Sequence, residues 1–458
     1  MDSPVKIRAD RVQPVVGPPD GGYGWFILVA CFLVFGLTFG VIKSFGVFYV
    51  EIHKYFETTA TGTSWITSIA VGTIHCVAPL GSALSARLGH RAVVMIGGLL
   101  SSVGLVAGSY SQNLVQLYIS VGLLTGFGYA LTWTPTVTML GLYFEQRRPL
   151  ANALASAGEC ILTFLLTPLF QLLVDLYSWR GAMLVLGGLQ LNLCVCGGLL
   201  RPLNTLGRSP PWEVDKEKGD PVLDTLPPTK ASPCRTDKDI AKNQDQKARR
   251  AELQSKVLRY VDYTLISDLR FVVYSMFGVF AALGFFAPAL FLVPYARSRG
   301  VEEYQAAALM SISAALDLTG RLFFGWLANL RLVETVQQLT ATVILLGLVL
   351  MLCPLASSFP ELAAFSAAYG LAFGATVSVH ITVLAEVVGI QRLGSALGFF
   401  MLIRSCGGLL GPPIAGFFID KMSDYGTGFL MAGVALIVSA LFLLLLHLMN
   451  RRGQQEVT

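Results

Sequence analysis

Long apolar stretches alternate with short polar ones along the 458 residues of this chain. The hydrocarbon core of a bilayer is about 30 Å thick, so a helix that crosses it needs roughly 20 apolar residues. Windows of that length predict about twelve membrane-spanning helices. Their expected ranges are 24–50, 64–86, 92–109, 115–140, 150–175, 181–200, 269–295, 304–329, 335–354, 361–386, 394–419 and 427–448. The pattern therefore predicts an all-α membrane protein.

One long polar interval divides the expected spans into two groups of six. Residues 201–266 are rich in Pro, Lys, Arg and Asp and include the run SPPWEVDKEKGDP. A segment of this composition buries too little apolar surface to offset the entropy of ordering it, so we expect a largely disordered loop. The chain then divides into a tail at 1–21, a six-helix bundle at 22–200, the loop at 201–266, a second six-helix bundle at 267–449 and a tail at 450–458.

Basic residues indicate how the chain is oriented. Lys6, Arg8 and Arg11 precede the first span, and this leader lacks the apolar core of a cleavable signal peptide. Loops expected on the same side carry further arginines, although the opposite loops also carry some charge. Because positive loops tend to stay in the cytosol, we expect a multi-pass protein with cytosolic N- and C-termini.

Composition excludes several classes of protein. With 54% hydrophobic and 13% charged residues, the chain is too apolar for a soluble enzyme. The net charge of +5 is spread over several loops, which argues against a nucleic-acid partner. The eight cysteines lie mostly in apolar segments and are interpreted as buried thiols, so we expect neither disulfides nor a metal site. An ATP-driven pump is disfavoured because the sequence has no phosphate-binding G-x-x-x-x-G-K-[ST] loop.

Three ionisable side chains lie inside expected spans: Lys43, Asp317 and Arg321. A charge at bilayer depth costs about 2.5 to 3.5 kcal/mol, so it normally faces a partner or a water-filled path. Asp317 and Arg321 are four residues apart and can form an ion pair on one helix face. Two structural alternatives stay open: Lys43 could extend to the membrane surface, and the Asp317–Arg321 pair could serve the fold alone.

Several motifs carry a resemblance to a known family. The first span opens with DGGYGWFILVACF (20–32), and the fifth with YFEQRRPLANALASAG (143–158). Two further runs are GFFAPALFLVPY (284–295) and GLLGPPIAGFFID (408–420). Together they resemble the monocarboxylate transporter family of the major facilitator superfamily. The motif residues are Asp20, Gly21, Gly22, Gly24, Trp25, Arg147 and Arg148.

This resemblance implies a fold, an activity and partners. The fold is a major facilitator fold of two six-helix bundles that rock about a central site. The activity is proton-coupled symport of small organic monocarboxylates across the plasma membrane, with lactate, pyruvate or ketone-body-like acids as candidates. Lys43, Asp317 and Arg321 stand at the family's positions for proton coupling and substrate binding. Protons are then the coupling ion and no other cofactor is expected; besides the bilayer, a single-span immunoglobulin-type ancillary glycoprotein is an expected partner.

Five residues depart from the pattern of the lactate-carrying relatives. Glu159 replaces a small residue, and Arg404 stands where those relatives tend to have an acid. Phe39 replaces a hydroxylated aromatic, and Ile381, next to His380, replaces a bulky aromatic that narrows the lactate pocket. We interpret all five as possible pocket or coupling residues, and expect the site to accept acids larger than lactate.

Two alternatives to proton-coupled symport stay open. One is a proton-independent facilitator or exchanger of another small solute, such as an amino acid, creatine or taurine. The other is a membrane receptor that transports nothing. The charged residues inside the spans argue against the receptor, because signalling alone does not require a charged lining.

Overall fold

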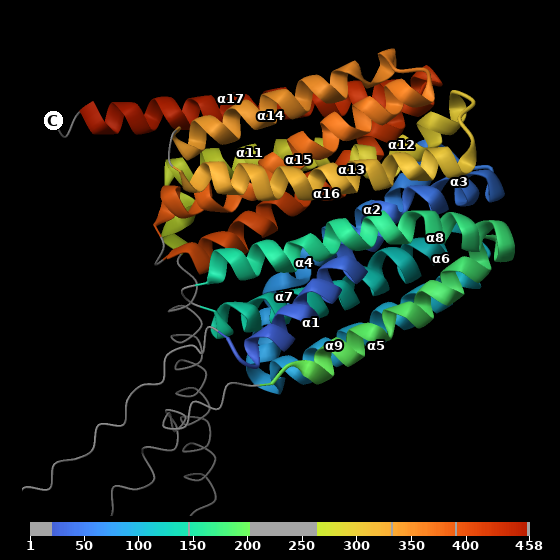
Figure 1. Cartoon of the computed structure of the whole chain (residues 1–458), viewed down its shortest axis with the longest axis horizontal. Helices are drawn as coiled ribbons and strands as arrows, with labels where there is room; N and C mark the ends of the chain where they lie inside the picture. Colours follow the sequence, from blue (N-terminus) through green and yellow to red (C-terminus); the bar gives the residue numbers. More distant parts are fainter. Residues whose placement is uncertain (1–20, 145–146, 202–262, 331–332, 390–391, 456–458) are drawn as a thin grey trace, which may run out of the picture. The chain divides into compact units, whose positions relative to one another are not determined.

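The computed structural model describes residues 21–144, 147–201, 263–330, 333–389 and 392–455. These belong to one of two units of the chain, Asp20–Pro202 with Asp262–Thr458. The expected N-terminal tail and most of the expected loop at 201–266 lie outside the described residues. The described part is helical throughout (Figure 1).

The helices follow the apolar stretches closely. In the first half of the chain they are α1 (Gly24–Phe35), η1 (Gly36–Gly40), α2 (Val41–Ser44), α3 (Gly46–Tyr55), α4 (Ala60–Leu88), α5 (His90–Ser109), α6 (Leu114–Leu117), η2 (Tyr118–Leu124), α7 (Thr125–Tyr143), α8 (Arg148–Gln190) and α9 (Asn192–Leu199). In the second half they are η4 (Tyr263–Ser267), α11 (Leu269–Phe285), α12 (Ala287–Ser298), α13 (Glu303–Asn329), α14 (Thr335–Leu352), η5 (Cys353–Leu355), α15 (Phe359–Val388), α16 (Leu393–Met422) and α17 (Gly426–Gln455).

Polar residues between the apolar stretches start several of these helices. The Thr59 side chain accepts from the backbone N–H of Gly62 at the start of α4. Asn113 and Asp268 cap α6 and α11 in the same way, and Ser358 opens α15 with a capping box. These side chains satisfy backbone N–H groups that have no partner within the helix, so each helix begins where the apolar stretch begins.

Eleven of the described helical stretches are long and apolar enough to cross a bilayer. One of them, Leu150–Leu199, is 50 residues long, which is far more than a single crossing needs. Ser178 interrupts it with a φ of 58° and a ψ of 171°, so the chain turns there and crosses again. The described residues therefore carry the twelve crossings that the pattern predicts.

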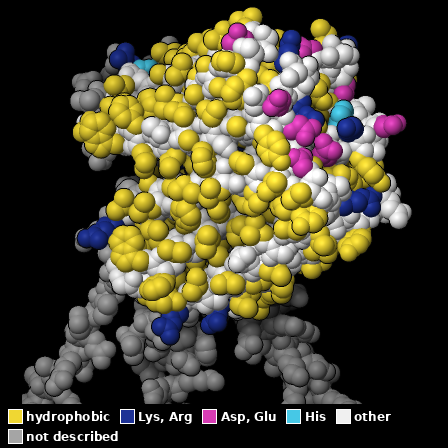
Figure 2. Space-filling model, turned by 45° about the vertical axis from the view of Figure 1, so that its right-hand side comes forward, with side chains coloured by type: hydrophobic (Ala, Val, Ile, Leu, Met, Phe, Trp, Pro, Cys, Tyr) yellow, Lys and Arg dark blue, Asp and Glu magenta, His cyan; other side chains and the backbone are white. Residues whose placement is uncertain are grey.

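Two bundles are formed by these crossings. In the first bundle α1 packs on α8, and α5 packs on α7. In the second bundle α13 packs on α15, and α17 packs on α11 and α14. The bundles meet along α4 with α16, α8 with α13, and α3 with α12. Figure 2 shows hydrophobic side chains over most of the visible surface, as a protein in a bilayer requires.

The two ends of the bundles differ in the chain segments that lie there, and they are called the linker end and the turn end. The linker end carries Arg201 and Tyr263, where the chain passes from one bundle to the other. The turn end carries the short connections at 56–59, 299–302 and 423–425. Acidic side chains gather in one region of the surface in Figure 2.

At the turn end, Asp420 of α16 joins the two bundles. Its carboxylate accepts from the backbone N–H groups of Ala60 and Thr61 at 2.6 and 2.9 Å, and from the Thr61 hydroxyl at 2.6 Å. A carboxylate at a helix N-terminus also interacts favourably with the helix dipole. Close by, Arg297 of α12 pairs with Glu303 and lies 3.7 Å from Glu51 of α3. The turn end is therefore closed by polar contacts between the bundles.

Glycines let neighbouring helices approach until their backbones touch. A Cβ at Gly374 of α15 would lie 2.2 Å from the backbone oxygen of Asp317 in α13. A Cβ at Gly158 of α8 would lie 2.0 Å from the backbone oxygen of Phe32 in α1. Only glycine permits both approaches. Each contact lies beside one of two acidic residues, since Gly374 packs on the backbone of Asp317 and Gly158 directly precedes Glu159.

We expect Gly374→Ala to destabilise the protein by about 1 to 3 kcal/mol, because the added methyl group must push α13 and α15 apart. The measurement is the melting temperature of the purified protein in detergent. Gly398→Ala in α16 is the matched control, since a Cβ there meets nothing within 4 Å. Equal melting temperatures for the two variants would contradict the close packing of α13 on α15.

Candidate functional site: a charged cluster between the bundles

An irregular stretch of the first crossing positions Lys43. The π-helical turn η1 (Gly36–Gly40) is followed by the short α2, and the regular helix resumes only at Gly46. At this turn the α8 backbone lies close, with the Glu159 oxygen 3.3 Å from where a Gly40 Cβ would be. Turns of this kind interrupt a helix and re-aim its side chains, and they are frequent at functional sites.

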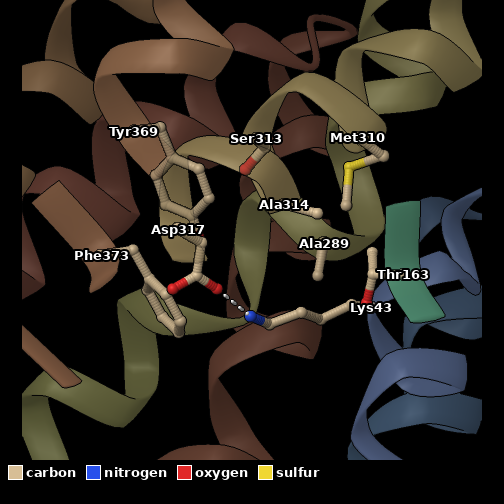
Figure 3. Close-up of a pocket in the computed structure, with 9 residues that line it drawn as sticks. All are labelled: Lys43, Thr163, Ala289, Met310, Ser313, Ala314, Asp317, Tyr369 and Phe373. Atoms are coloured by element: carbon tan, nitrogen blue, oxygen red, sulfur yellow. Dashed lines mark hydrogen bonds and ion pairs between the residues drawn. The ribbon is translucent and has the colours of Figure 1, made fainter. Parts of the chain in front are cut away.

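Lys43 lies between two carboxylates from different helices. Its Nζ is 2.8 Å from Asp317 Oδ2 on α13 and 2.8 Å from Glu159 Oε1 on α8. Figure 3 shows the Lys43 side chain reaching across to Asp317. The lysine is thus held by both bundles at once.

Arg321 completes the cluster from the other side. Its Nε donates to Asp317 Oδ1 at 2.8 Å, and its Nη2 donates to Asp317 Oδ2 and Glu159 Oε2, both at 3.1 Å. The i, i+4 ion pair that the spacing predicts is present. We call Lys43, Glu159, Asp317 and Arg321 the charge quartet; its two cations and two anions form a closed ring.

The quartet is balanced in charge, and three of its four residues are almost fully buried. The exposed fraction is 2% for Asp317, 8% for Arg321 and 9% for Glu159. Two of its contacts, Lys43 with Asp317 and Arg321 with Glu159, cross from one bundle to the other. Removing one partner would strand a buried charge, which costs far more than the net stabilisation of the pair.

A small pocket lies beside the quartet. Its lining is Lys43, Thr163, Ala289, Met310, Ser313, Ala314, Asp317, Tyr369 and Phe373 (Figure 3). The cavity volume of about 10 Å³ leaves room for about one water molecule. The Lys43 Nζ lies 4.4 Å from the centre of the Phe373 ring, so a cation–π contact adds to its ion pairs. The pocket joins a charged end to apolar walls, and a larger occupant requires the bundles to move.

The other candidate residues lie outside this lining. Phe39 packs against the Trp133 ring at 5.7 Å and the Phe35 ring at 6.4 Å. Ile381 of α15 is 44% exposed. His380 lies near Arg404 and is also within electrostatic reach of Arg321 of the quartet. The roles of these residues in selectivity or coupling stay predictions.

The described residues of the family motif lie at the linker end. The Tyr23 hydroxyl donates to the backbone oxygen of Leu199 at 2.8 Å, which ties the start of α1 to the end of α9. Trp25 is exposed and stacks edge-on against Phe144. Arg147 is exposed, whereas Asp20 and the Arg148 side chain are outside the described residues.

Sequence reasoning missed two aromatic residues of the pocket, Tyr369 and Phe373. They are four residues apart on α15 and share a face of that helix. Each is followed directly by a glycine, Gly370 or Gly374, that packs against the α13 backbone. That repeated pairing of an aromatic with a glycine was the signal available in the sequence.

Comparisons with known proteins agree with this architecture. The sequence model described as Major Facilitator Superfamily matches residues 28–348 and 338–457. A crystal structure of a mutant of the nucleoside transporter NupG covers 93% of this chain and is itself covered completely, with a TM-score of 0.68. At 13% sequence identity this likeness concerns the fold alone.

Several curated proteins are similar over almost the whole chain. Monocarboxylate transporter 2 of Mesocricetus auratus is 35% identical over 440 residues, which are 95% of this chain and 86% of that protein. Monocarboxylate transporter 12 of Mus musculus is 38% identical, covering 97% and 89%. Monocarboxylate transporter 7 of Homo sapiens is 35% identical, covering 94% and 87%. With its twelve crossings in two bundles, the chain belongs to the monocarboxylate transporter family of the major facilitator superfamily.

Proposed function

We propose that this transporter carries small organic monocarboxylates together with protons, by alternating access across the plasma membrane with both termini in the cytosol. The charge quartet is the observation that carries this proposal. Its two contacts between the bundles must break whenever the bundles separate at this level. A proton and an anion are the two species that can replace the partners lost in that step.

The exchange of partners can be followed by charge. Protonation of Glu159 or Asp317 removes one anion from the quartet and leaves one cation, Lys43 or Arg321, without a partner. The carboxylate of the cargo then replaces the missing anion. One proton and one carboxylate enter together, so the net charge of the site is the same before and after loading. The buried site avoids an uncompensated charge only if both bind.

The pocket beside the quartet supports a small amphipathic cargo. Lys43 and Asp317 form the charged end of the pocket, and Ala289, Met310 and Phe373 form part of its apolar walls. A short-chain acid presents the same combination of one charged group and a small apolar body. The names of the similar transporters agree with this class of cargo.

Polar contacts between the bundles, at the turn end and at the level of the pocket, support alternating access. Asp420 holds the N-terminus of α4, and Ser311 of α13 donates to the backbone oxygen of Phe164 at 3.0 Å. In an alternating-access cycle these contacts hold one side shut while the other side opens. We take this state as the one closed towards the outside.

We expect Lys43→Gln to abolish proton-coupled uptake, because the quartet then has two anions and one cation and no longer needs the cargo carboxylate. Uptake of radiolabelled butyrate and the accompanying pH change would be measured in vesicles of known orientation. Lys54→Gln is the matched control, since Lys54 is exposed at the end of α3. Normal coupled uptake by Lys43→Gln would rule out the assignment, and uptake without a pH change in the native protein would favour a proton-independent facilitator.

Within the quartet, we expect Asp317→Asn and Arg321→Gln each to destabilise the protein by about 3 to 5 kcal/mol, because each strands a buried charge. The double variant should recover part of that loss, since Lys43 and Glu159 still balance each other. The melting temperatures of the native protein, the two single variants and the double variant would give the coupling free energy between the two substitutions. The exposed pair Arg299 and Asp424, 3.7 Å apart, is the control and should be additive within about 0.5 kcal/mol. Additive effects at 317 and 321 would argue against a direct pair.

At the turn end, we expect Asp420→Asn to favour opening by roughly two- to thirtyfold, since losing a helix cap costs about 0.5 to 2 kcal/mol. Ser311→Cys provides a reporter between the bundles, whose reaction with a membrane-impermeant maleimide is followed by mass spectrometry. The reaction should be faster when Asp420→Asn is added. Asp424→Asn, at the same end, is the control. An unchanged rate with Asp420→Asn would show that this carboxylate does not hold the bundles together.

A further inference from the structure

Arg404 of α16 faces the interior of the protein. Exposed residues of α16 recur at Leu402, Cys406, Leu410 and Phe417, a spacing that places them on one face of the helix. That face is the one towards lipid. Arg404 lies on the opposite side and is partly buried. Its remaining exposure is therefore to an internal space.

The surroundings of Arg404 come from both bundles. Its Cζ lies 5.3 Å from the centre of the Phe285 ring of α11. His75 of α4 and His380 of α15 both lie within the electrostatic reach of its guanidinium. The buried Tyr274 hydroxyl donates to the backbone oxygen of His380 and packs this corner. None of these side chains carries a negative charge at neutral pH.

Arg404 differs in this respect from the other cations at the membrane centre. Lys43 and Arg321 are both paired with Glu159 and Asp317. Across the described ranges of the chain, no carboxylate forms an ion pair with Arg404. A guanidinium cannot shed its proton to avoid the cost of burial. A positive group in such a place requires a mobile anion or water as its partner.

Arg321 is poorly placed to accept a further anion in this state. Its Nε and Nη2 donate to the two quartet carboxylates, and its Nη1 lies 3.5 Å from the backbone oxygen of Ser156. Two-pronged binding of a carboxylate needs two free N–H groups on one edge of the guanidinium. While the quartet is closed, Arg321 does not offer such an edge. Among the described residues, no carboxylate pairs with either edge of the Arg404 guanidinium.

A series of ring contacts connects Arg404 with the quartet pocket. The Phe285 ring meets the Phe373 ring at 5.5 Å, and Phe373 lies under Lys43. His380 is seven residues after Phe373, which puts it on the same face of α15 and about 10 Å further towards the linker end. Arg404 therefore lies on the linker side of the pocket. An anion that arrives from that side meets Arg404 before it meets the quartet.

We propose that Arg404 is the anchor for the cargo carboxylate while the quartet is closed, and that the quartet serves proton exchange. The ligand class is a small organic monocarboxylate, held by two N–H groups of Arg404 with its apolar body near Phe285. This inference rests on the proposed function and assigns its two parts to different places: the cargo carboxylate binds first at Arg404, and the proton binds at the quartet. Loading the quartet then requires the carboxylate to move from Arg404 towards Lys43 when a quartet acid takes up a proton.

Binding to the purified protein tests this division. Butyrate should raise the melting temperature of the native protein in detergent, because a ligand of the folded state stabilises it, and uncharged butyramide should not. Arg404→Gln should need at least about tenfold more butyrate for the same rise, which is the effect of losing charge-assisted hydrogen bonds. Arg404→Lys should fall between the two. Arg270→Gln, which removes an exposed cation at the start of α11, should match the native protein.

Photolabelling of the native protein gives a result that does not depend on the variants folding. A diazirine-bearing butyrate analogue should label residues 396–408 of α16 and 281–285 of α11. Label confined to α2 and α13 would overturn the inference, as would equal butyrate affinity in the native protein and Arg404→Gln. Failure of the proposed function gives a different result, in which the native protein neither binds nor transports butyrate.

Discussion

The constraint on which the rest of this protein depends is that charges inside a bilayer must be balanced. Lys43, Glu159, Asp317 and Arg321 meet this constraint as a group: two cations face two anions, and each cation contacts both acids. Because the members come from both bundles, the balance exists only when the bundles are together at that level. Charge balance at the quartet therefore depends on the conformation of the protein, so binding of a charged species can shift a carrier between its two access states.

Close backbone contacts make this balance possible. The 2.8 Å ion pairs of Lys43 with Glu159 and Asp317 require that α8 and α13 lie at a fixed distance from the first crossing. Gly158 and Gly374 allow the close packing of α8 on α1 and of α15 on α13 beside these acids. The π-helical turn before Lys43 then aims the lysine across the interface. The packing and the chemistry of the site thus depend on the same few positions. A substitution that changes only the spacing of the helices would therefore also change the distances of the ion pairs.

Sequence patterns were sufficient for the helices and insufficient for the contacts between them. All twelve crossings follow the apolar windows, including the pair that is joined without a loop at Ser178, because bilayer thickness sets both their length and their composition. The Asp317–Arg321 pair was predictable because helical spacing alone brings the two residues together. The partners of Glu159 were not, since Lys43 and Arg321 are 116 and 162 residues away along the chain and no local rule relates them. The pocket role of Tyr369 and Phe373 was not predicted from the sequence either. Aromatic residues are common in apolar helices, and only the packing of α15 on α13 distinguishes these two.

The contact of Asp420 with α4 has a consequence for how such a protein can change over evolutionary time. Two of the three groups bound by Asp420 are backbone N–H groups, which every residue except proline supplies. Substitutions at positions 60 and 61 therefore leave most of this contact intact, and selection on it falls almost entirely on the single acidic residue. Apart from Thr59, which caps α4, the loop before this helix can diverge without loss of the Asp420 contact. One carboxylate can keep the same closing contact in proteins whose outer surfaces have little else in common.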